Sequence, residues 1–427
     1  MKPIIKTVKG TREFYPEEMA IRNWLYEHLQ AVSNSFGYQE YDGPFIETID
    51  LYAAKSGEEL VKKQSFVFED RGGDEVTLRP ELTPSLARMV AQKQRELTYP
   101  LRWWSFGPFW RYERPQKGRT REFFQWNADL IGADSPEADA ELVAICVNFF
   151  KRVGLTTEQV EIVVNDRQLV DAELNKIGIA QELKAEVIHL VDRRDKMPAS
   201  EWEAFALKSG LTQAQLDGLK VMLADVDLWK NSENLTRFFA ALAWMGVDAY
   251  VSFDPQIIRG LDYYTGIVFE ARDLDKEGRA ILGGGHYGNL VGDVGGDPLP
   301  GVGFAMGDVM MTLVLEKYGC IPPLAKSPVQ VLTTVFDTEG IGNSFALAQK
   351  LRDSGIRATS YLEFTKLPKQ FKYADRIGAH FAVIVGPDEA AQGLVTIKDM
   401  QTRSQVTVPQ DKMVRQLKEM LAEQSPV

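Results

Sequence analysis

Residues 109–125 read FWRYERPQKGRTREFFQ, and they give the clearest indication of the fold. Its aromatic ends favour two β-strands, and the polar residues between them indicate the connecting loop. Five basic side chains surround this hairpin: Arg111, Arg114, Lys117, Arg119 and Arg121. Because side chains alternate along a strand, Arg111 and Glu113 share a face, where Arg111 can be braced and still present its guanidinium to a phosphate. Phe123 offers a flat face for a purine. The alternative interpretation is a solvated, charged hairpin.

The residues on either side extend the hairpin into a sheet. Strand-like segments at 76–78, 101–106 and 123–131 are accompanied by a helical segment at about 84–95, and strands resume through 255–305. We expect antiparallel pairing among these segments and a mixed α and β fold. The hairpin strand that starts at Phe109 is expected to continue to Arg114.

A second unusual strand runs from Arg259 to Glu270. It mixes one cation, two phenols and two carboxylates where a strand usually carries aliphatic side chains. Gly260 and Gly266 remove side chains where a neighbouring backbone or a ligand comes close. We interpret the run as the wall of a substrate site, and the alternative is a tyrosine-rich edge strand over a core.

Residues 77–84 read TLRPELTP and form a third candidate. Glu81 and Thr83 lie beside a proline-fixed turn, where they could receive an ammonium group. The alternative is that Thr83 caps a helix with Pro84 at its first position. A cap explains Thr83 but not Glu81.

Composition limits the class of protein. The 427 residues, 44% hydrophobic and 26% charged, fit two or three globular domains. The apolar runs are only strand length and the first residues lack a signal-peptide core, so we expect a cytoplasmic protein without membrane spans. Two cysteines and four histidines show no ligand spacing, which argues against a Cys/His zinc site. The net charge of -11 argues against nonspecific coating of nucleic acid.

Two breaks divide the chain. Residues 166–240 are rich in Lys, Glu, Leu and Ala and indicate a helical insertion, and prolines cluster without periodicity at 321–328. We therefore expect one domain over 1–325 and a small α/β domain over 326–427. Residues 325–427 hold 13 Lys+Arg against 11 Asp+Glu, a charge of +2 that permits local phosphate contact.

These motifs resemble those of histidyl-tRNA synthetases, a family of class II aminoacyl-tRNA synthetases, across essentially the whole chain. Residues 9–12, KGTR, are similar to the family's opening, and Pro44 fits its dimer-forming motif 1. The hairpin over 111–125 is similar to motif 2. Residues 259–270 resemble the first histidine-specific signature, and 284–287, GGHY, the second.

The resemblance implies an α+β fold. A class II antiparallel sheet of six or seven strands would be flanked by helices, with the helical insertion at about 166–240 over the acceptor stem of a tRNA. The C-terminal α/β domain, which contains QFKYAD at 370–375, is similar to the family's anticodon-binding domain. A homodimer is also implied.

The family's reaction implies roles for the phosphate side. ATP activates histidine to histidyl-adenylate, and histidine then passes to the 3′ end of tRNA(His). By resemblance Arg111 and Arg259 hold the α-phosphate, and Phe123 stacks on adenine. Glu113 contacts adenine or braces Arg111, while Mg²⁺ bridges the phosphates through oxygen ligands. Gln116 would lie near the first base pair of the tRNA. No residue of the chain is assigned as a metal ligand.

The same resemblance implies a histidine site. Seven residues would form it: Glu81 and Thr83 for the ammonium group, Arg119 and Gln125 for the carboxylate region, and Asp129, Tyr264 and Tyr287 for the imidazole. A site that hydrogen-bonds both ring nitrogens rejects analogues lacking them by about 10⁴-fold or more. No editing domain is therefore expected.

Two positions depart from the family pattern. Met310 stands where motif 3 usually carries an arginine that contacts the γ-phosphate, and His286 stands where an arginine is commoner. Losing one charge-assisted phosphate contact costs on the order of 2 to 4 kcal/mol. These departures keep an alternative open: a synthetase-like paralogue without ligase activity that binds histidine or tRNA as a regulator, like the regulatory subunit of ATP phosphoribosyltransferase.

Overall fold

The computed structural model describes residues 3–53, 63–116, 118–194, 197–257, 264–275, 280–324 and 328–424. The chain divides into two compact units. One contains residues 1–13 and 24–322, and the other contains residues 14–23 and 323–427.

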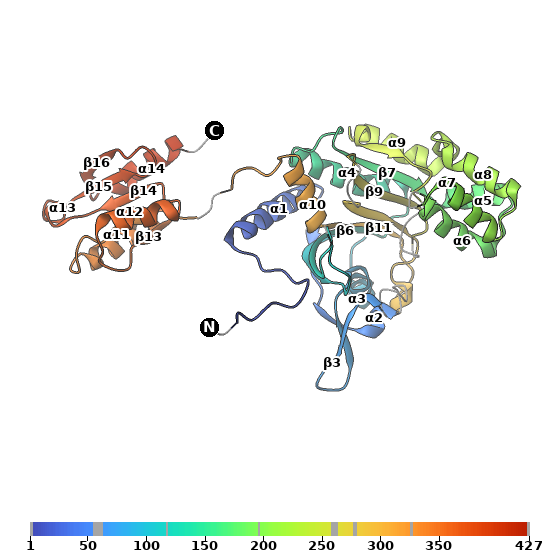
Figure 1. Ribbon diagram of the computed structural model, residues 1–427, viewed down its shortest axis with the longest axis horizontal. Helices are drawn as coiled ribbons and strands as arrows, with labels where there is room; N and C mark the ends of the chain where they lie inside the picture. The colour runs from blue at the N-terminus through green and yellow to red at the C-terminus, as the bar shows by residue number, and fades with distance from the viewer. Residues whose placement is uncertain are drawn as a thin grey trace. The chain divides into compact units, whose positions relative to one another are not determined.

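The larger unit is built around one sheet that has eight strands within the described residues (Figure 1). Their order is β1 (Gln39–Glu40), β5 (Leu101–Trp110), β6 (Glu122–Ile131), β11 (Gly301–Gly307), β10 (Leu282–Tyr287), β9 (Ile267–Asp273), β7 (Val160–Asp166) and β8 (Val251–Phe253). The inner pairs are antiparallel, as predicted. The sheet has more strands than the six or seven expected. The short strands β1 and β8 pair in parallel with β5 and β7 at its two edges.

The hairpin pairs β5 with β6 from Leu101 opposite Ile131 to Trp110 opposite Glu122. The prediction that its first strand continues to Arg114 was wrong. Beyond Trp110 the chain leaves the sheet, because the clustered cations and a proline do not support ladder pairing. A bridge between Gln116 and Arg119 turns the resulting loop.

Helices cover the faces of this sheet: α1 (Pro16–Ser35), α4 (Pro136–Arg152) and α10 (Asp308–Lys317). The side chain of Ser135 caps α4 by accepting a hydrogen bond from the N–H of Ala138 at 3.2 Å. Helix α4 is almost entirely buried, and it lies across the middle strands of the sheet (Figure 1). The helix and the sheet thus share one hydrophobic core.

A small sheet stands beside the main one. It consists of β2 (Ile46–Thr48), β4 (Glu75–Leu78) and β3 (Phe66–Glu69), and the short helices α2 (Ile49–Ala53) and α3 (Thr83–Lys93) follow β2 and β4.

The described residues between 166 and 240 are mainly helical, as the sequence predicts. The helices are α5 (Arg167–Lys176), α6 (Gln181–Asp192), α7 (Ala199–Lys208), α8 (Gln213–Ala224) and α9 (Glu233–Trp244). Helix α9 packs back on α4, which joins this segment to the main core.

The smaller unit has its own sheet and its own core. The strand order is β13 (Ala358–Ser360), β12 (Val331–Thr333), β14 (Phe381–Ile384), β15 (Leu394–Asp399) and β16 (Gln405–Pro409). The predicted helices appear as α11 (Ile341–Asp353), α12 (Leu367–Arg376) and α14 (Met413–Gln424), and the short α13 (Pro387–Ala391) was not predicted. Over the described part of the chain, none of the helices has the length and apolar character that crossing a bilayer requires.

Candidate active site

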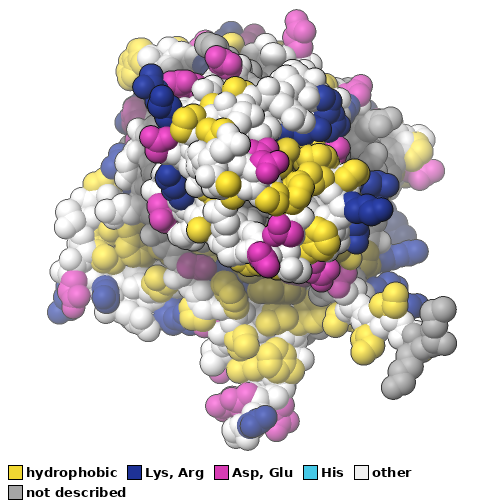
Figure 2. All heavy atoms as spheres, turned by 90° about the vertical axis from the view of Figure 1, so that its left-hand side faces the viewer, with side chains coloured by type: hydrophobic (Ala, Val, Ile, Leu, Met, Phe, Trp, Pro, Cys, Tyr) yellow, Lys and Arg dark blue, Asp and Glu magenta, His cyan; other side chains and the backbone are white. Residues whose placement is uncertain are grey.

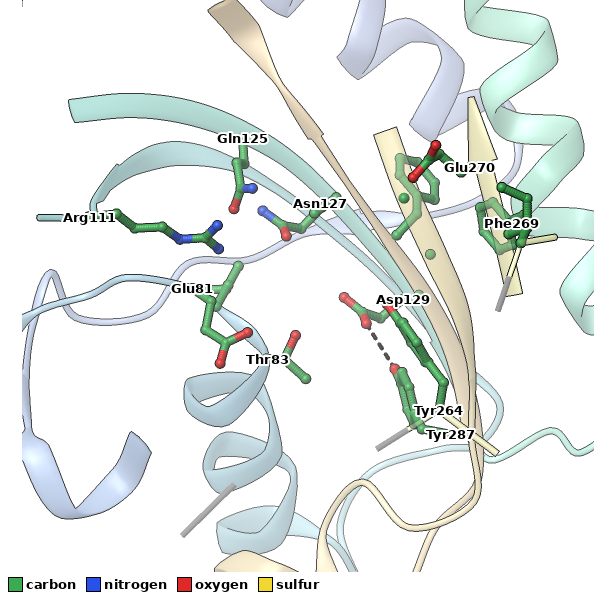
Figure 3. A pocket seen from close by; sticks show the side chains of 17 residues that line it. Glu81, Thr83, Arg111, Gln125, Asn127, Asp129, Tyr264, Phe269, Glu270 and Tyr287 are labelled. Carbon is green, nitrogen blue, oxygen red and sulfur yellow. Dashed lines mark hydrogen bonds between the residues drawn. The ribbon is translucent and has the colours of Figure 1, made fainter. Parts of the chain in front are cut away.

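A cavity of about 270 Å³ opens on the main sheet between β6, β10 and the start of α3. It brings together seven of the predicted site residues: Glu81, Thr83, Arg111, Gln125, Asp129, Tyr264 and Tyr287. Figure 3 shows Arg111 and Gln125 at one end of this cavity and the aspartate and tyrosines at the other. Residues more than 200 positions apart in sequence thus meet in one place.

Strand β6 supplies one side of this cavity. Because alternate side chains of a strand share a face, Gln125, Asn127 and Asp129 all point into it (Figure 3). Sequence reasoning missed Asn127, although its place midway between two predicted residues was the signal. Asn127 is buried, and its Nδ2 has no hydrogen-bond partner among the residues that the structure describes. An amide donor buried in this way is suited to an acceptor on a ligand.

Strand β11 lies between β6 and β10. Two of its glycines leave room for a side chain of β6 to contact a side chain of β10 across it. The hydroxyl of Tyr287 donates to Oδ1 of Asp129 at 2.8 Å (Figure 3). Gly303 lies between Asp129 and Gly285 in register, and a Cβ there would overlap Oδ1 of the aspartate. A Cβ at Gly301 would come within 2.8 Å of the Tyr287 ring. Larger residues at these two positions would therefore displace the pair.

The carboxyl of Asp129 is electrostatically unusual. Burial raises its pKa from the ordinary 3.8 to about 7, although the hydrogen bond from Tyr287 opposes the change. A partner that donates to this carboxylate, as an imidazole N–H does, would favour its ionised form. Tyr264 lies nearby against Gly285, where a Cβ would come within 2.9 Å of its ring.

Glu81 and Thr83 reach the cavity from the start of α3. The alternative that Thr83 caps this helix is wrong, because the residue at the cap is Leu82 and no side chain makes a capping hydrogen bond. The hydroxyl of Thr83 instead points toward the cavity (Figure 3). Arg79 anchors this segment: it is fully buried, its Nε donates to the Pro108 carbonyl at 2.9 Å, and it pairs with Asp42.

A second cavity, of about 120 Å³, adjoins the first and shares Arg111 and Gln125 with it. The Nε of Arg111 donates to the Pro80 carbonyl at 3.0 Å, and its guanidinium lies 5.3 Å from the centre of the Phe123 ring. The Phe123 ring stacks on Phe109 with centroids 6.0 Å apart. Arg111 is therefore held from two sides at the junction of the cavities.

The basic loop lines this second cavity. Glu113 forms an ion pair with Arg119, whereas Arg111 is held by a carbonyl. The expected bracing of Arg111 by Glu113 rested on both residues belonging to one strand, and the strand ends before them. Arg119 lines the second cavity rather than the first, and Gln116 lines neither.

Met310 also lines the second cavity, on the first turn of α10. Its sulfur occupies the space that a Cβ at Gly118 would take, so it packs directly on the basic loop. Two positions earlier, Asp308 is buried and accepts a hydrogen bond from the Phe124 N–H at 2.8 Å. The other oxygen of Asp308 pairs with Arg12 at 2.7 Å. The unusual residues of this segment thus have structural contacts.

The run from Arg259 to Glu270 is described only from Tyr264 onward, and Arg259 lies outside the described residues. Phe269 and Glu270 line the first cavity, as does Ile257. Phe269 and Glu270 belong to the run that the sequence predicts as the wall of a substrate site, whereas Ile257 was not predicted. Among the described residues there is no group of three or more His, Cys, Asp or Glu side chains placed to hold a metal ion.

Comparison with known families identifies both parts of the chain. Residues 10–309 match the family model described as histidyl-tRNA synthetase. Residues 330–420 match the model described as anticodon binding domain.

Individual relatives match nearly end to end. A histidine–tRNA ligase from Opitutus terrae is 38% identical and covers 96% of this chain and 97% of its own. One from Leptospira biflexa is 35% identical, with 97% of each covered. The crystal structure of histidyl-tRNA synthetase from Nostoc sp. superposes with a TM-score of 0.83 at 25% identity, covering 98% of this chain and 100% of that one. Nothing in these matches favours a regulatory paralogue. The chain belongs to the histidyl-tRNA synthetase family, with the class II fold.

Proposed function

We propose that this chain is a histidine–tRNA ligase that activates histidine with ATP and transfers it to the 3′ end of tRNA(His). The observation that carries the proposal is the pair of adjoining cavities that share Arg111 and Gln125. One cavity would hold the amino acid, and the other would hold the nucleotide. The shared residues lie where a carboxylate would meet an α-phosphate.

The polar side chains that line the first cavity complement the polar groups of histidine. Glu81 and Thr83 would accept from the ammonium group, and Asp129 would accept from an imidazole N–H, with Tyr264 and Tyr287 beside the ring. At the opposite end the carboxylate would meet Gln125 and Arg111, with Arg119 reaching it from the loop. We add Asn127 to this end, because its unpartnered Nδ2 can donate to a carboxylate or phosphate oxygen but not to an ammonium group.

The second cavity would hold the nucleotide. Phe123, with Phe109 behind it, offers a face for adenine, and Glu113 would contact the base. The histidine carboxylate is already ionised at neutral pH, so activation needs stabilisation of the phosphate charge rather than a strong base. Arg111 supplies that charge. Arg259, which lies outside the described residues, is proposed for the same phosphate on resemblance alone. Mg²⁺ would enter with ATP, bound mainly by phosphate oxygens.

The tRNA would span both domains, which we propose to be residues 1–325 and 326–427. Gln116 would approach the acceptor end, and the helical insertion at 166–240 would cover it. In the smaller unit Phe336, Leu362 and Phe364 are exposed just after β12 and β13. These neighbouring strands are parallel, so the three side chains follow the same edge of the sheet. Exposed aromatic side chains there can stack on unpaired anticodon bases.

We also propose a homodimer that works in the cytoplasm. Figure 2 shows hydrophobic side chains along the protruding three-stranded sheet, with charged side chains at its tip. Phe45, Ile46, Val67 and Phe68 are all exposed on this sheet. Apolar surface of this kind is typical of an interface. The mass of the particle in solution, measured by light scattering, should be twice the chain mass of 48.0 kDa.

Histidine-dependent exchange of pyrophosphate into ATP tests the activation step. Pure protein with ATP and Mg²⁺ should exchange with histidine and not with other amino acids. Arg111→Lys keeps the charge but cannot keep both contacts of the planar guanidinium, so exchange should fall by about 10² or more. Arg237→Lys, a change at an exposed arginine paired with Glu137, is the control. Absence of exchange from the unsubstituted protein would contradict the proposal.

A further inference from the structure

His286 stands on β10 directly before Tyr287 and points away from the cavity, because neighbouring side chains of a strand face opposite sides. Its ring lies between two carboxylates. Nδ1 is 2.8 Å from Oδ1 of Asp139 on α4, and Nε2 is 3.2 Å from Oδ1 of Asp134, in the connection from β6 to α4. The histidine is only 7% exposed. The contact with Asp139 is buried, whereas the side chain of Asp134 is 78% exposed.

The geometry defines the protonation state of this ring. An ionised carboxylate only accepts hydrogen bonds, and a neutral imidazole carries a proton on one nitrogen alone. When both carboxylates are ionised, an oxygen at each ring nitrogen calls for the doubly protonated imidazolium; burial raises the pKa of Asp139, and the contact with His286 opposes that change. Asp166, at the start of α5, adds a third negative charge nearby. Burial alone would lower the pKa of His286, but Asp139 and Asp134 outweigh it and hold that pKa above the ordinary 6.5.

The same residue is tied to both tyrosines of the histidine site. Its carbonyl accepts a hydrogen bond from the N–H of Thr265 at 2.8 Å, and Thr265 directly follows Tyr264. Its own strand continues into Tyr287, whose hydroxyl reaches Asp129. Two links thus hold β10. Tyr287 contacts Asp129 on the cavity face of the sheet, and His286 contacts Asp134 and Asp139 on the opposite face.

We propose that protonated His286 is a positioning residue, which clamps β10 to Asp134 and Asp139 so that Tyr264 and Tyr287 face the imidazole of bound histidine. The inference rests on the proposed ligase activity and adds a pH dependence to it. The clamp is complete below the ordinary pKa of a histidine, 6.5, and is lost as the pH rises through the higher value in the folded protein. Affinity for histidine should weaken over that range, whereas the rate at saturating histidine should not.

A comparison of variants isolates residue 286 from other titrating groups. His286→Arg keeps a cation that can pair with both carboxylates at every pH, and Asp129 and the imidazole of the substrate titrate alike in both proteins. The KM for histidine is measured by pyrophosphate exchange in both proteins. The ratio of the KM of the unsubstituted protein to that of His286→Arg should be near one at about pH 6. It should rise about tenfold as the pH passes through the raised pKa of the His286 ring, the effect of losing one charge-assisted hydrogen bond. His286→Gln should raise the KM for histidine about tenfold at about pH 6, should match the unsubstituted protein once the His286 ring has lost its proton, and should leave kcat within about twofold.

Nuclear magnetic resonance of the ligand-free protein tests the clamp without activity. The chain has four histidines, so the His286 ring signals are assigned by their loss in His286→Gln. They should report protonation of both nitrogens at about pH 6 and a pKa above 6.5, which should fall in Asp139→Asn. A neutral ring at about pH 6 would overturn the clamp. Normal exchange with a KM ratio that is flat in pH would overturn the positioning role alone, and failure of the unsubstituted protein to exchange would overturn the ligase function.

Discussion

Replacing Asp129 with asparagine should make the larger unit more stable at pH 8 and, at the same time, poor at activating histidine. The carboxyl is buried at the bottom of the first cavity, and its pKa is raised from 3.8 to about 7. One pKa unit corresponds to about 1.36 kcal/mol, so keeping this group ionised costs the folded protein on the order of 4 kcal/mol. Asparagine has the same shape, is neutral, and still accepts from Tyr287.

The sign of the pH dependence follows from the direction of this shift. Because the pKa is higher in the folded protein, the carboxyl destabilises the fold increasingly as the pH rises from about 4 through about 7, and the cost is constant above that. The stabilisation by Asp129→Asn should therefore be absent near pH 4 and complete, at a few kcal/mol, above pH 7. The gain in stability is expected at the expense of function, as at many binding sites.

Urea unfolding followed by tryptophan fluorescence measures this effect. All eight tryptophans lie between residues 24 and 244, so the signal reports on the larger unit. Asp273→Asn is the control of opposite sign: Lys317 and Tyr318 outweigh burial and hold the pKa of Asp273 below its usual value, so this change should destabilise at neutral pH. If Asp129→Asn is no more stable than the unsubstituted protein at pH 8, the argument from burial is refuted.

Three further substitutions test single contacts. Asn127→Ala should slow exchange at low histidine about 10- to 100-fold by removing the unpartnered donor, and unchanged kinetics would remove Asn127 from the site. Gly303→Ala should raise the KM for histidine by more than about tenfold, because its Cβ would displace Asp129, while Gly342→Ala, where a Cβ meets nothing within 4 Å, should not. Arg79→Lys should lower the free energy of unfolding by about 3 kcal/mol in urea, since an ammonium cannot replace its planar contacts, and an unchanged midpoint would contradict its role as anchor.

The parts of the site that sequence could predict depend on short-range patterns. The aromatic ends and the basic loop predict the hairpin over 109–125. Glu81 is predicted as a site residue because a helix cap does not account for it. The alternation of Gln125, Asn127 and Asp129 was equally readable, because every second residue of a strand shares a face. Asn127 was not predicted, because an uncharged amide within a strand carries no chemical signal of its own.

Other features depend on contacts between distant segments. The pairing of Tyr287 with Asp129 requires β11 to lie between their strands and to carry glycine at two positions, which no local pattern reveals. The bracing of Arg111 was misjudged because alternation was applied beyond Trp110, where the strand ends. The clamp on His286 likewise joins β10 to an aspartate 147 positions earlier in the sequence.

Charging of tRNA measures the complete reaction that we propose for this chain. Purified protein should attach radioactive histidine to a tRNA(His) transcript in the presence of ATP and Mg²⁺, and should leave other transcripts and other amino acids unreacted. Omission of ATP should abolish the product. A protein that exchanges pyrophosphate with histidine but never charges tRNA(His) would contradict the account, and one that charges tRNA with a different amino acid would contradict the assignment of the first cavity.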